Sequence, residues 1–166
     1  IERVIASFAK HAEAADHLVI KHHPLDRGYH DYSALLDCLQ QEYGVAGRIL
    51  YIHDQHLPTL LANTRGVVVI NSTVGLSALH HGTPAVAMGE ALYNIEGLTA
   101  QCHLDDFWRE PERWVPDRRL YQAFLAHLIQ RTQLNGNFYR HGLFGVSHTP
   151  ARSGLLRRIL AGGRRS

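Results

Sequence analysis

The sequence predicts an α/β protein with a Rossmann-like, doubly wound parallel sheet. Short runs rich in branched apolar residues alternate with stretches of helical periodicity, and the connections between them are short. Strands are predicted at residues 17–21, 48–52, 67–71 and 84–88. The third run opens with four consecutive branched apolar residues, as in strands that are buried on both faces. Right-handed βαβ units join such strands, and ligands bind at their carboxyl ends.

Helices are predicted before and after these strands. The apolar spacing of residues 2–14 predicts an amphipathic helix. Asp31 precedes a helix that runs to about Tyr43 and stops at Gly44. Further helices are predicted at 57–62, with Pro58 in the first turn, at 74–81, closed by Gly82, at 117–133 and at 153–160. Between the strand at 84–88 and about Pro116, the chain is predicted to be an aromatic-rich loop without an assigned helix or strand.

Length and composition favour one domain. The chain has 166 residues, of which 45% are hydrophobic, and this is enough for one core. We expect the core at about residues 1–134 and an extension at 135–166. The formal charge of +2 lacks the strong excess of basic residues that is typical of nucleic-acid-binding proteins. Cys38 and Cys102 fit a reducing compartment, and no apolar run approaches the roughly 20 residues of a membrane span.

The segment from Asn71 to Gly75 carries the clearest functional signal. Ser72 or Thr73 stands at the N-cap position of a helix that directly follows a buried strand. Free N–H groups and the positive end of the helix dipole then face the carboxyl edge of the sheet. The two hydroxyl side chains and the small Gly75 allow a phosphate to approach closely. The segment predicts a phosphorylated ligand, although an ordinary helix cap has the same pattern.

Other loops at strand ends add candidate residues. Pro24 fixes an extended conformation at His23, which can donate to a phosphate, and Lys21 and Arg27 add positive charge. The alternative is a loop whose histidines only satisfy backbone carbonyls. Tyr93 and Glu96 can read sugar hydroxyls, or Glu96 can be a solvated charge.

Histidine is unusually frequent, with 13 residues. None of them forms the i, i+4 pair or the Cys-His spacing typical of a metal site. We therefore expect no metal and no other cofactor.

Taken in order, these motifs resemble a known family. The motifs are His-His-Pro-Leu-Asp-Arg-Gly-Tyr at 22–29, Leu-Pro-x-Leu-Leu at 57–61, Asn-Ser-Thr-Val-Gly-Leu-Ser-Ala-Leu at 71–79, Gly-Thr-Pro at 82–84 and Gly-x-Ala-x-Tyr-x-x-x-Gly-Leu-Thr at 89–99. Over about residues 1–110 the chain is similar to the capsule polysaccharide biosynthesis family of Gram-negative bacteria, the KpsS/KpsC group, and the first motif is most similar to the KpsS branch.

This resemblance implies the carboxyl-terminal, nucleotide-binding half of a GT-B glycosyltransferase. Such an enzyme transfers Kdo from CMP-Kdo, with retention and without a metal, to a phosphatidylglycerol-based lipid at the cytoplasmic face of the inner membrane. By resemblance, His23 contacts the CMP phosphate, Ser72 and Thr73 bind the same phosphate, and residues around Tyr51 and His53 hold cytosine. A capsule assembly or export complex is a further expected partner.

The resemblance also implies that a part of the enzyme lies outside this chain. The acceptor-binding half and the carboxylate that acts at the anomeric carbon are expected upstream of residue 1. We therefore expect the isolated chain to bind CMP weakly and to transfer no sugar. In addition, Asn94 stands where many relatives are expected to have Asp, so no carboxylate role is assigned there.

Three alternatives remain open from the sequence. The chain can belong to a UDP-sugar transferase, to a sugar-nucleotide epimerase, or to a non-catalytic module that binds a phosphorylated ligand or joins an export complex. The arginine-rich end, with Arg157 and Arg158 beside an apolar stripe, is either a solvated terminus or a basic patch for anionic lipid.

Overall fold

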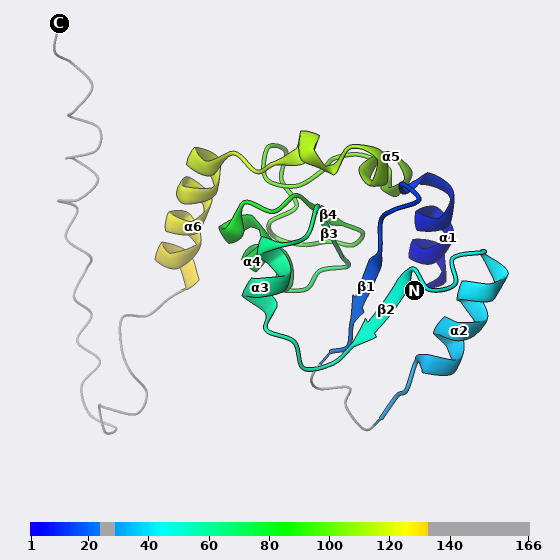
Figure 1. The fold of residues 1–166 in the computed structure, drawn as a ribbon. Helices are drawn as coiled ribbons and strands as arrows, with labels where there is room; N and C mark the ends of the chain where they lie inside the picture. The colour runs from blue at the N-terminus through cyan, green and yellow to red at the C-terminus, as the bar shows by residue number, and fades with distance from the viewer. Residues whose placement is uncertain (24–28, 133–166) are drawn as a thin grey trace, which may run out of the picture. The chain divides into compact units, whose positions relative to one another are not determined.

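The computed structural model describes residues 1–23 and 29–132 (Figure 1). In chain order the helices and strands are α1 (Glu2–His11), β1 (Leu18–Lys21), α2 (Ser33–Glu42), β2 (Ile49–Ile52), α3 (Leu57–Ala62), β3 (Val67–Val69), α4 (Val74–His81), β4 (Ala85–Ala87), α5 (Leu104–Arg109), a 3-10 helix (Pro111–Trp114) and α6 (Arg118–Thr132). The alternation confirms the predicted α/β class. The helix expected at 153–160 lies outside the described residues.

The described strands form two separate two-stranded parallel sheets. β1 pairs with β2, so that Leu18 lies opposite Ile49, and β3 pairs with β4, so that Val67 lies opposite Ala85. The single sheet expected from the sequence is therefore not continuous in the described part of the chain. The strands are short, with four residues in β1 and β2 and three in β3 and β4.

The β3–β4 sheet is covered on both faces. Ala85 packs with Leu61 of α3 and Ala78 of α4 in one apolar cluster. Val86, which points to the opposite face because side chains alternate along a strand, packs with Leu104 and Phe107. This double cover explains the continuous apolar run in the sequence.

The β1–β2 sheet is covered on one face only. α1 and α2 supply buried residues such as Phe8 and Leu36, which pack with Ile49 and the inward residues of β1. Val19 and Leu50 are paired across the two strands on the opposite face, and they are 42% and 50% exposed. The two sheets therefore differ in how completely the described residues enclose them.

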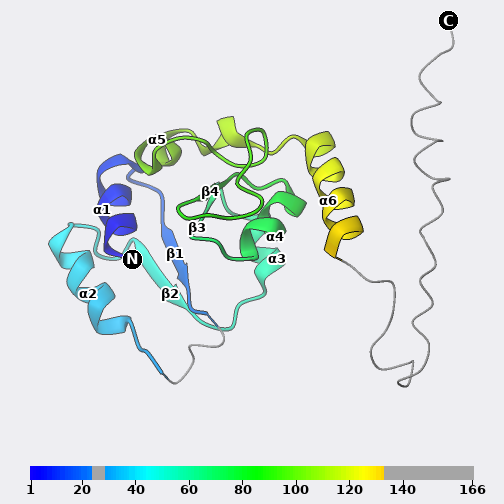
Figure 2. The ribbon, with the colours of Figure 1, turned by 180° about the vertical axis from the view of Figure 1, so that it is seen from behind.

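Helix α5 lies in the aromatic-rich segment for which no helix or strand is predicted. α5 packs beside α1, as both ribbon views show (Figure 2). Ser7 in α1 donates to Asp105 at 2.5 Å, and the indole of Trp108 donates to Ser7 at 3.0 Å. Phe107 is buried in the cluster that covers β4. The loop is thus a structural layer that holds the first helix.

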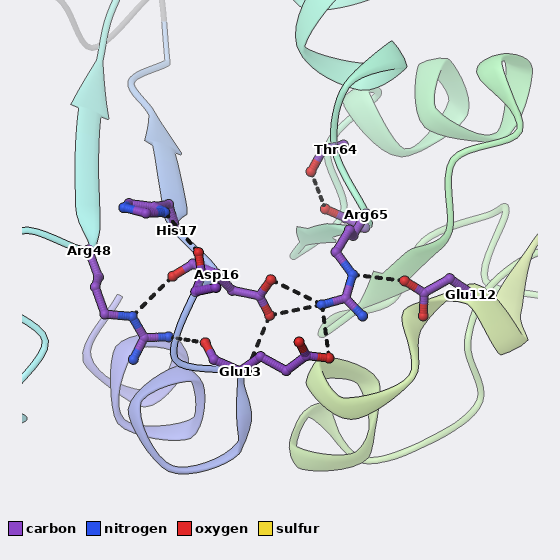
Figure 3. A network of polar contacts seen from close by, with 9 residues as sticks. Glu13, Asp16, His17, Arg48, Thr64, Arg65 and Glu112 are labelled. Carbon is purple, nitrogen blue, oxygen red and sulfur yellow. Dashed lines mark hydrogen bonds and ion pairs between the residues drawn. The ribbon is translucent and has the colours of Figure 1, made fainter.

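Charged side chains join the amino ends of β1, β2 and β3 (Figure 3). Arg65, just before β3, donates to both carboxylate oxygens of Asp16 at 3.0 Å and to Glu112 at 2.8 Å. Arg48, just before β2, donates to the backbone carbonyls of Asp16 and Glu13. The hydrogen bond from Arg65 lowers the pKa of Glu112 below its ordinary value. We call these five residues the arginine clasp.

None of the helices in the described ranges is both long and apolar enough to cross a membrane.

Candidate functional site

Four aromatic polar side chains gather at the carboxyl ends of β1 and β2. Leu18, Ile20 and His22 alternate onto the same face of β1, and Tyr51 and His53 do the same along β2. The backbone N–H of His22 donates to the carbonyl of Ile52 at 2.8 Å, which continues the ladder one residue beyond β1. His22 and His53 are therefore neighbours across the strands. Together with Tyr32 and Tyr51 they form what we call the histidine cluster.

The rings of the histidine cluster are in close contact. His22 and His53 are stacked, with centroids 4.9 Å apart. His53 also lies 4.8 Å from the ring of Tyr51, and Tyr32 lies 5.9 Å from His22. Nδ1 of His22 shares a hydrogen bond with the hydroxyl of Tyr51. Strand pairing places His22, Tyr51 and His53 on one face of the sheet, and Tyr32 joins them from the start of α2.

One nitrogen of the cluster has no hydrogen-bond partner within residues 1–23 and 29–132. His22 is only 5% exposed, and its Nε2 atom is buried without a hydrogen bond among the residues that the structure describes. An unsatisfied buried polar atom costs roughly 1–3 kcal/mol. Such an atom is uncommon in folded proteins and often marks a functional position or an ordered water.

His23 is the predicted phosphate contact, whereas the buried histidine of this motif is His22. His23 is exposed and follows Lys21, which is half-buried, on the opposite face of the strand. The signal that identifies His22 is the period-two pattern of Leu18 and Ile20 continued past the end of the strand. Arg27 lies outside the described residues. The predicted contacts of His23, Lys21 and Arg27 with phosphate stay predictions.

The predicted phosphate turn, Asn71 to Thr73, lies at the start of α4 as expected. Thr73 is the N-cap residue, although its hydroxyl makes no capping hydrogen bond. The hydroxyl of Ser72 instead accepts from the N–H of Val74 at 3.2 Å. Asn71 and Thr73 are exposed and Ser72 is half-buried. The turn therefore presents polar groups to solvent at the positive end of an eight-residue helix.

Tyr93 supports this turn from inside the protein. Its side chain is 2% exposed, and its hydroxyl donates to the backbone carbonyl of Ser72. Burial raises the pKa of Tyr93 above its ordinary value. A Cβ atom at Gly75 would overlap the ring of Tyr93. Gly75 is thus small because Tyr93 packs on it, a different reason from the close approach of a phosphate that the sequence suggested.

The loop from 89 to 101 is held by its own side chains. The Oδ1 atom of Asn94 accepts from the hydroxyl of Thr99 at 2.8 Å and from the amide of Gln101 at 2.9 Å. Glu96 is exposed and its backbone pairs with Thr99. A shallow groove is lined by Glu90, Ala91, Leu92 and Asn94. Contact of Glu96 with a sugar stays a prediction.

Several of the predicted residues fall into two groups. Tyr51 and His53 belong to the histidine cluster, whereas Asn71, Ser72 and Thr73 form the phosphate turn, against which Tyr93 packs. The contacts described above link residues within each group, and none of them links one group to the other. Within residues 1–23 and 29–132, no three His, Cys, Asp or Glu side chains are arranged to hold a metal ion.

Known proteins align with most of this chain. The chain is 47% identical over 139 residues to the "Capsule polysaccharide export protein KpsS" of Escherichia coli, an alignment that covers 84% of this chain and 35% of the relative. It is 42% identical over 147 residues to the "Capsule polysaccharide modification protein LipB" of Neisseria meningitidis serogroup A, covering 88% of this chain and 35% of the relative.

The chain thus spans about a third of the length of these relatives. No solved structure matches it. The family model described as "Capsule polysaccharide biosynthesis protein" matches residues 1–139. This match covers most of the chain, including both groups of site residues, and the chain belongs to the capsule polysaccharide biosynthesis protein family.

Proposed function

We propose that this chain is the donor-binding part of a retaining glycosyltransferase that takes Kdo from CMP-Kdo during capsule synthesis. The proposed product is a β-linked Kdo on a phosphatidylglycerol-based lipid at the cytoplasmic surface of the inner membrane. Family membership supports a role in capsule synthesis, and the residues at the strand ends support a nucleotide ligand. The Rossmann-like, GT-B form of the whole protein is part of the same proposal, and the parallel α/β pairing is compatible with it.

The observation that carries the proposal is the phosphate turn. Asn71, Ser72 and Thr73 directly follow β3 and precede α4, with their polar groups at the surface. The N-terminus of a helix attracts anions through its free N–H groups and its dipole. Tyr93 holds the turn through the carbonyl of Ser72. The turn is therefore positioned before any ligand arrives, which favours the binding of a charged group.

The residues have distinct roles in this proposal. During transfer, the bond between the anomeric carbon of Kdo and the CMP phosphate oxygen breaks, and the phosphate keeps the electron pair. Ser72, Thr73 and the helix N-terminus bind the resulting phosphate, and His23 donates a hydrogen bond or a proton to it. Lys21 and Arg27 add positive charge, Asn71 completes the turn, and Tyr51 and His53 contact the base.

Other parts of the proposal rest on the sequence pattern and on the resemblance. No metal takes part, and Glu96 binds the sugar. The carboxylate that reacts at the anomeric carbon lies on a part of the enzyme outside this chain, so the 166 residues alone transfer no sugar. A capsule assembly or export complex is the proposed protein partner.

Thermal unfolding with CMP, CDP and UDP tests the proposal. CMP is expected to raise the melting temperature more than UDP does, because the site recognises cytosine and one phosphate. Ser72→Ala and His23→Ala are expected to remove this increase, whereas Ser77→Ala, later in α4, keeps it. A larger increase with UDP would indicate a UDP-sugar enzyme, and no increase with any nucleotide would indicate a non-catalytic module.

A further inference from the structure

The shared hydrogen bond between His22 and Tyr51 leaves two arrangements of protons. A neutral imidazole carries one hydrogen, on either Nδ1 or Nε2. If the hydroxyl of Tyr51 donates to Nδ1, the hydrogen of His22 is on Nε2. If Nδ1–H donates to the phenol oxygen, Nε2 carries only a lone pair, and the hydroxyl hydrogen of Tyr51 turns to another acceptor. The hydrogen-bond direction at Tyr51 is therefore coupled to the tautomer of His22.

Burial selects between these arrangements. Nε2 of His22 is enclosed without a partner among the described residues. A buried N–H without an acceptor is rarer in proteins than a buried acceptor without a donor. The enclosed Nε2 thus favours the tautomer with the hydrogen on Nδ1.

We propose that His22, as the Nδ1–H tautomer, makes the hydroxyl of Tyr51 a hydrogen-bond donor that selects ligands with an acceptor atom at this position. The proposal rests on the proposed function, since it concerns the same nucleotide site. The acceptor is an oxygen or a ring nitrogen of the nucleotide, on the base or on the phosphate. His22 is then a positioning residue, and Tyr51 determines specificity. A site that donates one hydrogen bond discriminates strongly against a ligand that presents an N–H there.

The tautomer of His22 is measured without any ligand. Long-range ¹H–¹⁵N spectra of the ¹⁵N-labelled chain distinguish protonated from unprotonated ring nitrogens. His22→Gln identifies the signals of His22 by their loss. We expect Nδ1 protonated and Nε2 unprotonated in the wild-type chain. Protonation at Nε2 overturns the proposal.

Ligand titrations test the role of Tyr51. Tyr51→Phe is expected to weaken CMP binding about fivefold to tenfold, the range for one neutral hydrogen bond. Tyr43→Phe is the matched control, because the hydroxyl of Tyr43 contacts Glu2 at the other end of α2. An equal loss with cytidine places the acceptor on the nucleoside, and a loss with CMP alone places it on the phosphate.

The possible failures are distinguishable. If the wild-type chain binds neither CMP nor cytidine, the proposed function fails, and the proposed role of Tyr51 fails with it. If the wild-type chain binds CMP and Tyr51→Phe binds it equally well, only the role of Tyr51 fails. The thermal unfolding of Tyr51→Phe shows whether the variant is folded when binding is measured.

Discussion

The arginine clasp and the histidine cluster lie at opposite ends of β1 and β2, and they differ in how completely their polar groups are hydrogen-bonded. In the clasp, Arg65 contacts three carboxylates, and Arg48 contacts two backbone carbonyls. In the histidine cluster, Nε2 of His22 has no partner among the described residues. The difference teaches that the amino ends pair their charged groups within the fold, whereas the carboxyl ends leave one buried nitrogen unpaired among the described residues.

The largest expected effect tests whether the carboxyl ends also hold structural residues. Gly75→Ala inserts a methyl group into the ring of buried Tyr93. Such overpacking is expected to lower the free energy of unfolding by about 1–3 kcal/mol, measured by urea denaturation. Tyr93→Leu is expected to lower the free energy of unfolding less in the Gly75→Ala background than in the wild-type chain. Full additivity would show that the two positions do not interact.

The second prediction tests whether the arginine clasp contributes to stability without contributing to ligand binding. Arg65→Met is expected to lower the free energy of unfolding by about 1 kcal/mol at low salt, and less at high salt, because the pairs are partly exposed. CMP binding is expected to stay unchanged. Arg113→Met, which removes only an exposed pair with Glu110, is the control and is expected to have almost no effect. A weaker affinity for CMP in Arg65→Met would contradict the division between the two ends.

The change with pH in the stability that the arginine clasp contributes is expected to be smaller than the effect of Arg65→Met itself. The pKa of Glu112 is lowered below its ordinary value of 4.5 by the hydrogen bond from Arg65. A group with a lowered folded pKa stabilises the protein above its unfolded pKa, and this contribution is lost as the pH falls through the folded pKa. The stability difference between wild type and Arg65→Met is therefore expected to be full above about pH 4.5 and to shrink below it. Urea denaturation from pH 7 to pH 3 measures this trend, and a difference that grows on acidification would contradict it.

The smallest expected effect on stability comes from the histidine cluster. His22→Phe keeps a planar ring and removes the unsatisfied nitrogen, so the free energy of unfolding is expected to change by less than about 1 kcal/mol. The same variant is expected to weaken CMP binding, because Tyr51 loses its partner. A loss of stability above about 2 kcal/mol would show that Nε2 is satisfied in solution, for example by an internal water.

Local sequence signals predicted several elements well. The bounds of α3 and α4 agree with the prediction because Pro58 starts one helix and Gly82 ends the other. α1 ends earlier than predicted, at His11, because Ala12 has extended backbone angles that no local residue signals. α5 has six residues like α3, but it was not predicted, because no proline stands in its first turn as Pro58 does in α3. Its place depends on contacts with α1, far away in the sequence.

Around the candidate site residues, too, local signals predict some features, and contacts between distant segments determine the others. The turn at Ser72 and Thr73 was identified from a strand directly followed by a helix start. The role of Gly75 was not, because it depends on Tyr93, which belongs to a distant loop. The burial of His22 follows from the alternation of Leu18 and Ile20, which continues one residue beyond the end of β1. Tertiary packing, which no single segment contains, decides the role of Gly75.

The hydrogen bond between Ser7 and Asp105 spans 98 positions of the chain. A contact of such long range closes a large loop, so its entropy cost must be met before α1 gains anything from α5. Helix α1 has only ten residues, too few for a stable isolated helix in water. During synthesis, α1 must therefore wait for the later segment around Asp105 before it acquires its final packing.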